Sequence, residues 1–409
     1  MVTPYQDKRI VLGITGSIAA YKAADLASKM AQAGALVDVI LTGSAAQFVT
    51  PLTFQSVTGR MAFTDSDLWG SQGHIQHIGL ARKAQLLVIA PITANTIAKL
   101  THGIADNLLT VTTLAASCPV VIAPAMDGGM FNNPATQENL KILDERDVTI
   151  IGPAEGHLAS GMTGLGRMVE PQTLLGHIRH ALSRGGPLRK KKIVVTAGGT
   201  FEPIDPVRGI TNRSSGKQGF ALAQAALDRG AEVTLISGPT QLTAPVGAEF
   251  ITITSAEEME TAVLKSLADT TALIMAAAVA DYRPAKPSAQ KVKKSSGIPE
   301  ISLVGTTDIL TAVAAEKSKK GYPTVTVGFA AESHDLINNA RQKLEEKNLD
   351  LIVANDISAE DSGIAVDDNR VTIIDAGGGQ EDLPLMDKFD VAQHVLERVL
   401  GLLGLSVND

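Results

Sequence analysis

The feature that most constrains the fold is a strand–loop–helix–strand pattern in residues 192–240. A short apolar, β-branched run at residues 193–195 is typical of a buried parallel strand. A Gly-rich turn and a long polar loop follow, then a helix that ends at Gly230 and a second strand at residues 233–236. Loops at the carboxyl ends of such strands bind ligands, and amides at a helix start suit phosphate. The spacing matches neither G-x-G-x-x-G nor the Walker pattern, so the residues predict a nucleotide or phosphate site, with a purely structural loop as the alternative.

The first half of the chain repeats this pattern. Strand-like runs at residues 10–14, 37–41, 86–90 and 120–123 alternate with amphipathic helices and glycine breaks. The chain has 409 residues, of which 44% are hydrophobic and only 3% aromatic, a balance that favours parallel α/β sheets over a β-sandwich. We therefore predict an α/β protein with two doubly wound, mostly parallel-sheet, Rossmann-like domains.

The predicted boundary lies at Gly185-Gly186-Pro187, which ends a helix at residues 171–183 and precedes a basic run. We expect a first domain at residues 1–184, a solvated linker at residues 185–191 and a second domain at residues 192–409.

Charge and composition exclude several classes of protein. The formal net charge of −7 argues against a general nucleic-acid binder, which needs a basic face. The single cysteine, Cys118, rules out an intramolecular disulfide and fits a reducing compartment. No signal peptide or run of about 18–20 apolar residues is present, so we expect a cytoplasmic protein without membrane spans.

Several motifs resemble phosphopantothenate–cysteine ligases. The first is TAGGTFEPIDPVRGITNRSSGKQG at residues 196–219, and the others follow in that family's order: AAAVADYRP (276–284), KVKK (291–294), VGFAAE (327–332), ARQK (340–343), NLD (348–350) and AND (354–356). Residues 8 to about 180 resemble flavin-dependent phosphopantothenoylcysteine decarboxylases. Nearly the whole chain is therefore similar to the bifunctional bacterial enzymes of coenzyme A biosynthesis.

The resemblance implies two reactions. CTP-dependent ligation joins 4′-phosphopantothenate to cysteine through an acyl-cytidylate, with Mg²⁺, and FMN-dependent decarboxylation of phosphopantothenoylcysteine then yields 4′-phosphopantetheine. It also implies a homo-oligomer, with trimer contacts in the flavin domain and dimer contacts in the ligase domain. No metal ligands can be assigned from the sequence.

The flavin residues follow strand ends. Thr-Gly-Ser before a helix offers free N–H groups for a phosphate, although such turns are often only tight turns, and Thr93 can also be a helix N-cap. The resemblance implies that the FMN-contacting residues are Gly16, Ser17, Ile18, Thr42, Ser44, Thr93, Ala94 and Asn95.

Three positions carry the decarboxylase chemistry that the resemblance implies. HIGLAR at residues 77–82 makes His77 the base or electrostatic partner of the flavin, and a histidine suits proton transfer near neutral pH. Asp127 stands where the family commonly has an asparagine that binds the substrate carboxylate; an ionised aspartate would repel that group, so either its pKa is raised or other groups hold the acid. Ser160 occupies the place of a flap cysteine that donates a proton when the enethiol intermediate is reduced, and a serine is a far weaker acid. A water held by Ser160 is one possible donor; Cys118, at an expected helix-to-strand corner, is not.

The resemblance also implies roles in the ligase half. Asn212 stabilises the acyl-cytidylate and Lys291 contacts nucleotide phosphates. Lys343 and Lys347, four residues apart, share a helix face and hold the triphosphate; from the residues alone a solvated, glutamate-paired face is the alternative. The remaining nucleotide-site residues are Met275, Ala276, Ala277, Asp281, Asp308 and Phe329, with residues 284–302 as a mobile flap.

Three alternatives stay open at this point. The first half could be a peptide-cysteine decarboxylase or a prenyl-flavin enzyme, which the attached ligase motifs argue against. The chain could be a non-catalytic regulatory or scaffolding subunit, with Asp127 and Ser160 as signs of decay. Finally, an active ligase could carry a flavoprotein half that is impaired because the flap residue is Ser160.

Overall fold

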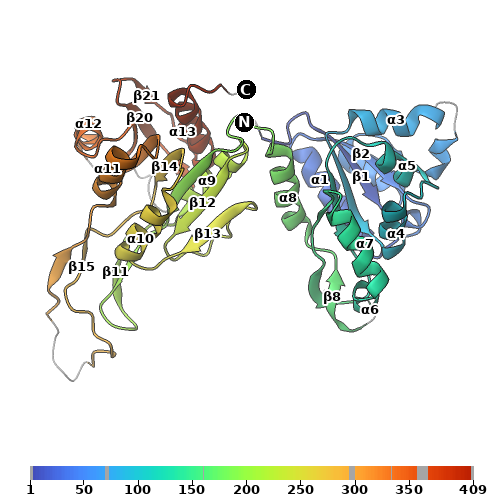
Figure 1. The fold of residues 1–409 in the computed structure, drawn as a ribbon, viewed down its shortest axis with the longest axis horizontal. Coiled ribbons are helices and arrows are strands. Elements are labelled where there is room, and N and C mark those ends of the chain that lie inside the picture. Colours follow the sequence, from blue (N-terminus) through green and yellow to red (C-terminus); the bar gives the residue numbers. More distant parts are fainter. Residues whose placement is uncertain are drawn as a thin grey trace. The chain divides into compact units, whose positions relative to one another are not determined.

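A computed structural model describes residues 3–69, 73–159, 161–293, 300–332, 334–356 and 367–406. The chain forms two compact units, residues 1–182 and residues 183–409 (Figure 1). Each unit is a sheet covered by helices on both faces, and no helix within the described ranges is long and apolar enough to cross a membrane.

The first unit is built on a parallel sheet with strand order β3-β2-β1-β4-β5-β6. Its central strands are almost entirely buried, as continuous apolar runs predict for strands covered on both faces. The strands are β1 (Arg9–Ile14), β2 (Leu36–Leu41), β3 (Ala62–Phe63), β4 (Leu86–Ile92), β5 (Val120–Pro124) and β6 (Thr149–Ile150).

Alternating residues of these strands face two helix layers. On one face α1 (Ala20–Gln32), α2 (Pro51–Thr58) and α8 (Pro171–Ser183) pack on side chains such as Ile10 and Leu12. The opposite face is covered by α3 (Gly73–Lys83), α4 (Ala94–His102), α5 (Leu108–Ala115) and α7 (Pro134–Asp144). Two short 3₁₀ segments (Ala45–Gln47 and Asp65–Leu68), helix α6 (Gly128–Phe131) and the hairpin of β7 (Ala154–His157) and β8 (Thr163–Arg167) complete the unit.

The second unit repeats the arrangement with strand order β13-β12-β9-β14-β17-β18-β20-β21. Its strands pair in parallel as far as β18, and β20 and β21 add an antiparallel edge. The strands are β9 (Lys192–Ala197), β12 (Glu232–Ser237), β13 (Ala248–Thr252), β14 (Ala272–Met275), β17 (Val325–Glu332), β18 (Leu351–Asp356), β20 (Val371–Asp375) and β21 (Gln380–Asp382).

Helices α9 (Lys217–Leu227) and α13 (Lys388–Leu402) pack on one face of this sheet. The other face carries α10 (Ala256–Ser266), α11 (Ile309–Lys320) and α12 (Leu336–Glu346). Short antiparallel ribbons pair β10 (Phe201–Pro203) with β11 (Gly209–Thr211), β15 (Tyr282–Pro284) with β16 (Leu303–Gly305), and β19 (Asp368–Asn369) with β22 (Met386–Asp387). The segments around β11 and β15 extend away from the second sheet in Figure 1.

Local sequence sets the ends of several helices. The Thr93 hydroxyl accepts the Thr96 N–H at the start of α4, and the helix ends at Gly103 in a left-handed conformation. The Ser255 hydroxyl caps α10 in the same way by accepting the Glu258 N–H. These small polar residues satisfy N–H groups that have no partner within the helix.

The predicted α/β class with two doubly wound, mostly parallel sheets is confirmed. The segment predicted as a solvated linker, residues 185–191, lies within the second unit. Leu188 is fully buried in the core of that unit, and its N–H donates to the Arg229 carbonyl at 2.8 Å. Arg189 and Lys190 are exposed, as expected for the basic run.

Candidate active sites

Thr15 joins the carboxyl ends of the two central strands of the first unit. Its hydroxyl donates to the Pro91 carbonyl at 2.9 Å and accepts the Thr93 N–H at 3.0 Å. Strands β1 and β4 are neighbours, and the chain leaves them in opposite directions across the sheet. This is the topological switch point at which open α/β sheets form a crevice, and Thr15 holds its two walls together.

A close contact draws the loop after β2 toward the same point. A Cβ atom on Gly16 would lie 2.4 Å from Cβ of Ser44, a distance that real side chains do not reach. The absence of a side chain at position 16 therefore lets the loops after β1 and β2 touch. This contact brings the predicted residues Gly16, Ser17, Thr42 and Ser44 to one end of the sheet.

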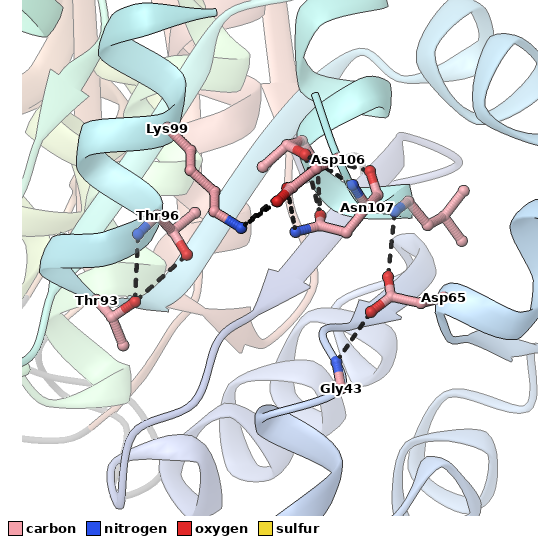
Figure 2. A network of polar contacts seen from close by, with 9 residues as sticks. Gly43, Asp65, Thr93, Thr96, Lys99, Asp106 and Asn107 are labelled. Atoms are coloured by element: carbon pink, nitrogen blue, oxygen red, sulfur yellow. Dashed lines mark hydrogen bonds and ion pairs between the residues drawn. The ribbon is translucent and has the colours of Figure 1, made fainter. Parts of the chain in front are cut away.

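A polar network fixes the surrounding loops (Figure 2). The Asp65 carboxylate accepts the N–H of Gly43 and the N–H of Leu108, each at 3.1 Å. Asn107 caps α5 by accepting the Thr110 N–H at 2.9 Å. Asp65 thus connects the loop after β2 to the start of α5 through charge-assisted hydrogen bonds.

A cavity of about 600 Å³ opens at this end of the sheet. It is bounded by the loops after β1, β4 and β5, the start of α1, and the β7–β8 hairpin. Its lining contains the predicted residues Gly16, Ser17, Ile18, Thr93 and Asp127. Ala94 and Asn95 form the first turn of α4 and are not among the described lining residues.

The β7–β8 hairpin is seated directly on the loop after β5. The Met126 N–H donates to the Gly166 carbonyl at 3.0 Å. A Cβ atom on Gly166 would lie 2.2 Å from the Met126 carbonyl oxygen, so only glycine permits this approach. The hairpin therefore forms one wall of the cavity, as a flap over the site would require.

Asp127 occupies the cavity as the N-cap of α6, and its carboxylate accepts the Gly129 N–H at 2.9 Å. Ser160, the other departure from the family pattern, lies outside the described residues, although its neighbour Ala159 lines the cavity.

Cys118 is half-buried between α5 and β5, and burial raises the pKa of its thiol. The structure thus agrees with the expected corner position of Cys118.

His77 is not brought to the cavity. It lies on α3, and the described residues that line the cavity do not include it. Its Nδ1 atom is buried and has no hydrogen-bond partner among the described residues. The predicted role of His77 stays a prediction.

Lys22 lines the cavity but was not predicted. Its side chain is 7% exposed, and its ammonium donates to the Met168 carbonyl at 3.1 Å and to Glu170 at 2.9 Å. Glu170 also pairs with Arg167 at 2.7 Å, and the hydrogen bond from Lys22 lowers the pKa of Glu170. The helical pattern of the sequence could have indicated Lys22. Position 22 falls on the apolar stripe of α1, beside Ala19 and Leu26, where a buried lysine needs a partner.

In the second unit Asn212 lies against the loop after β14. Its side-chain amide donates to the carbonyls of Ala278 and Val279, each at 3.1 Å. The Thr200 hydroxyl accepts the Ala280 N–H at 3.0 Å, which holds the loop after β9 against the same segment. Asn212 is thereby brought together with the segment that runs from Ala276 to Asp281.

The apolar side chains predicted for the nucleotide site pack on opposite faces of the second sheet. Met275 is 6% exposed and belongs to the core on the α10–α11 face, where it accepts a hydrogen bond from Thr196. Ala277 packs against that same core, whereas Ala276 and Phe329 pack against the core on the α9–α13 face. Met275 therefore supports the strand end from within the core.

Asp308 and Lys347 are brought together. The Asp308 carboxylate caps α11 by accepting the Thr311 N–H at 2.9 Å and lies 2.7 Å from the Lys347 ammonium. Burial alone would raise the pKa of Asp308, but the hydrogen bonds from Lys347 and Thr311 outweigh it and the pKa is lowered. Lys343 lies in the last turn of α12, and the Lys347 N–H donates to its carbonyl at 3.1 Å.

Asp281 and Lys291 are exposed. Within the described ranges no group of at least three His, Cys, Asp or Glu side chains could hold a metal ion.

Comparisons with known proteins cover both units. The Flavoprotein family model matches residues 2–183, and the model of the DNA/pantothenate metabolism flavoprotein C-terminal domain matches residues 188–402. The coenzyme A biosynthesis bifunctional protein CoaBC of Bacillus subtilis strain 168 is 45% identical over 399 residues, which span 97% of each chain. The corresponding protein of Escherichia coli strain K12 is 41% identical and spans 96% of this chain and 97% of its own.

A solved C-terminal domain of a coenzyme A biosynthesis bifunctional protein CoaBC is 38% identical, with a TM-score of 0.46, and covers 54% of this chain and 99% of its own. The two curated relatives match 97% and 96% of this chain, a span that takes in both of the segments matched by the family models. The chain therefore belongs to the family of bifunctional coenzyme A biosynthesis proteins, as its sequence motifs indicate.

Proposed function

We propose that the second unit joins 4′-phosphopantothenate to cysteine with CTP, and that the first unit then decarboxylates phosphopantothenoylcysteine to 4′-phosphopantetheine with FMN. The observation that carries this proposal is the cavity at the switch point of a flavoprotein-family unit, beneath a hairpin that bears the family's flap motif. The attached second unit carries the ligase motifs in order.

The residues around the cavity fit FMN. Gly16 allows the loops after β1 and β2 to touch beside the cavity, and the start of α1 provides N–H groups and a positive dipole end for the phosphate. A cavity of about 600 Å³ is in the size range of cofactor sites. Gly16, Ser17, Ile18, Thr42, Ser44, Thr93, Ala94 and Asn95 would hold the cofactor, which supplies the two-electron oxidation of the substrate thiol.

The charges in the cavity bear on how the substrate acid is held. Asp127 alone would repel a carboxylate. Lys22 and Arg167 also line the cavity and share the single carboxylate of Glu170, which leaves one net positive charge beside Asp127. We propose that these cations help to bind the substrate carboxylate, which asparagine binds in the family pattern. We also propose that His77 acts as the base or electrostatic partner of the flavin and that Ser160 holds the water that donates a proton.

The ligase reaction needs cations around a triphosphate, because negative charge on the phosphates must be offset as the acid attacks. Lys291, Lys343 and Lys347 would supply them together with Mg²⁺. Asn212 would stabilise the acyl-cytidylate, since it is already held against the loop after β14. Met275, Ala276, Ala277, Asp281, Asp308 and Phe329 would frame the nucleotide, with Met275 acting from the core.

An anaerobic reaction tests the decarboxylase half. The protein is mixed with phosphopantothenoylcysteine, flavin absorbance is followed, and products are identified by mass spectrometry. Phosphopantetheine with reoxidised flavin is expected, and Ser160→Ala and Ser160→Cys then locate the proton donor. Reduced flavin with a trapped enethiol would support an impaired half; no reaction in a flavin-loaded protein would remove the decarboxylase proposal.

A second assay tests the ligase half. We expect pyrophosphate release and phosphopantothenoylcysteine from phosphopantothenate, cysteine and CTP, with ATP as the comparison nucleotide. Turnover with ATP alone would overturn the choice of CTP, and no product with either nucleotide would overturn the ligase assignment.

We also propose a homo-oligomer with contacts near the flavin cavity. Ile18, Tyr21 and Met130 line the cavity, and 59%, 61% and 51% of their surfaces are exposed. Large apolar side chains exposed together are typical of protein interfaces. Sedimentation of the full chain should show an assembly larger than a monomer, and a monomer at micromolar concentration would contradict the proposal.

A further inference from the structure

Asp205 lies in the turn between β10 and β11, inside the EPIDPVR motif, and its side chain is fully buried. Its carboxylate accepts the N–H groups of Val207 and Arg208, each at 2.9 Å, and the Arg208 side chain at 3.1 Å. The hydrogen bonds from Arg208 lower the pKa of Asp205. These contacts alone would make it an ordinary turn residue.

A further contact reaches far along the chain. The Asp205 carboxylate also accepts the N–H of Val292 at 3.1 Å, and the Arg208 guanidinium donates to the Val292 carbonyl at 2.9 Å. Val292 is therefore held at both its N–H and its C=O. Its two neighbours in sequence are Lys291 and Lys293.

The same turn holds the chain just before these lysines. The Ser288 N–H donates to the Ile204 carbonyl at 2.8 Å, and the strands β10 and β15 lie side by side. Residues 288–292 thus lie along residues 204–208. A lysine on a surface segment has many rotamers and a mobile backbone, and fixing the backbone removes part of that freedom before a ligand arrives.

We propose that Asp205 is a positioning residue for Lys291 and Lys293 in the ligase reaction, acting through the peptide groups of Val292. The proposal rests on the proposed use of a nucleoside triphosphate by the second unit. Asp205 does not touch the nucleotide, because its side chain is buried and its oxygens face N–H groups of the protein. Cations held in place in this way stabilise phosphate charge without reorganising during the reaction.

The test compares Asp205→Asn with a matched control, Asp375→Asn, both in the full chain. Asp375 also accepts a turn N–H, from Gly379 at 2.9 Å, and also pairs with an arginine, Arg398. Its described contacts do not include residues 288–293. The control therefore removes a similar aspartate–arginine pair in the same unit without touching the lysine segment.

A second variant separates positioning from stability of the turn. Val292→Pro deletes the N–H that Asp205 accepts and keeps every side chain of the turn at residues 205–208. We expect Asp205→Asn and Val292→Pro each to raise KM for CTP about tenfold, with a smaller effect on kcat, and Asp375→Asn to leave KM unchanged. Trypsin should cleave after Lys293 faster in both variants than in the wild type or the control. Cleavage after Lys291 should be faster in Asp205→Asn alone, because trypsin does not cut the bond between a lysine and a proline.

Three outcomes would overturn the proposal. One is an unchanged KM and an unchanged cleavage rate in Asp205→Asn. Another is a fall in thermal stability in Asp205→Asn that the control reproduces, with no change specific to CTP. The third is a Val292→Pro variant that behaves as wild type. If the wild type itself does not use CTP, the proposed ligase function fails, and the cleavage rates still report whether Asp205 holds the lysine segment.

Discussion

The ammonium of Lys347, directly after α12, lies 2.7 Å from the carboxylate of Asp308, which caps α11. Sequence motifs assign both residues to the nucleotide site, but they do not indicate that the two are paired with each other. The pair places a cation at the N-terminal end of α11. A bound triphosphate would compete with Asp308 for this ammonium. Lys347 would then exchange its ion pair with Asp308 for a contact with a phosphate.

Lys347→Met should therefore raise KM for CTP by about tenfold, as expected when one phosphate contact is lost. The matched control is Lys317→Met, because Lys317 on α11 pairs with Asp350 at 2.5 Å in the same helix layer. The control should change the free energy of unfolding by about 1 kcal/mol or less and leave KM unchanged. Equal effects of the two variants on KM would contradict a nucleotide role for Lys347.

Removing Glu170 should lower the free energy of unfolding more than removing its ion-pair partner Lys22. Glu170→Ala leaves a buried ammonium without its carboxylate, whereas Lys22→Met leaves a carboxylate that is 55% exposed and can be solvated. We expect the first variant to lose about 2 kcal/mol of unfolding free energy and the second about half as much. Denaturation followed by flavin fluorescence measures this in the first unit, and the reverse order would show that the buried lysine does not depend on Glu170.

Gly166 should be indispensable and Gly164 replaceable, although both lie on β8. A Cβ at position 166 would lie 2.2 Å from the Met126 carbonyl oxygen, whereas a Cβ at position 164 would meet nothing within 4 Å. Gly166→Ala should displace the hairpin and lower decarboxylation at least about tenfold, with flavin still bound. Gly164→Ala should keep near-wild-type turnover; parallel losses in both would mean that the contact with Met126 is unimportant.

Asp65→Ala should weaken the flavin site through the network in Figure 2. It removes the acceptor for the Gly43 and Leu108 N–H groups, and loss of such caps costs about 1 kcal/mol. We expect weaker retention of FMN, because the loop after β2 is released from α5. Asp106→Ala is the control: it breaks the Lys99 ion pair, whose carboxylate is 50% exposed, and should keep FMN affinity unchanged. Equilibrium dialysis of FMN against both variants distinguishes the two outcomes.

His177 on α8 should make the first unit less stable in mild acid. Burial lowers the pKa of His177, so the folded state binds a proton less readily than the unfolded chain. Stability is therefore full above the unfolded pKa of about 6.5 and falls as the pH drops below it. Thermal unfolding from about pH 8 to about pH 5.5 should show a larger decrease for the wild type than for His177→Gln. Identical pH profiles would show that His177 is solvated.

The fold was largely readable from the sequence because buried parallel strands appear as continuous apolar runs. Residues 10–14 lie in β1 (Arg9–Ile14), and the predicted helix at residues 171–183 coincides with α8 (Pro171–Ser183). Local sequence patterns do not predict the burial of a side chain that is covered by residues distant in the sequence. Leu188 stands beside a basic run and looks like part of a linker, yet it is fully buried because the core of the second unit lies beneath it.

The sequence by itself determined the α/β class, the order of the two domains and the family, because ordered motifs and strand-like runs are local properties of the chain. The tertiary structure decided which of the motif residues meet. It gathered Gly16, Ser17 and Thr93 around one cavity, whose described lining does not include His77 of α3. It also joined Asp205 to Val292, which lies far along the chain. Such contacts depend on how strand ends and loops converge at the edge of a sheet, and spacing along the chain does not encode that distance.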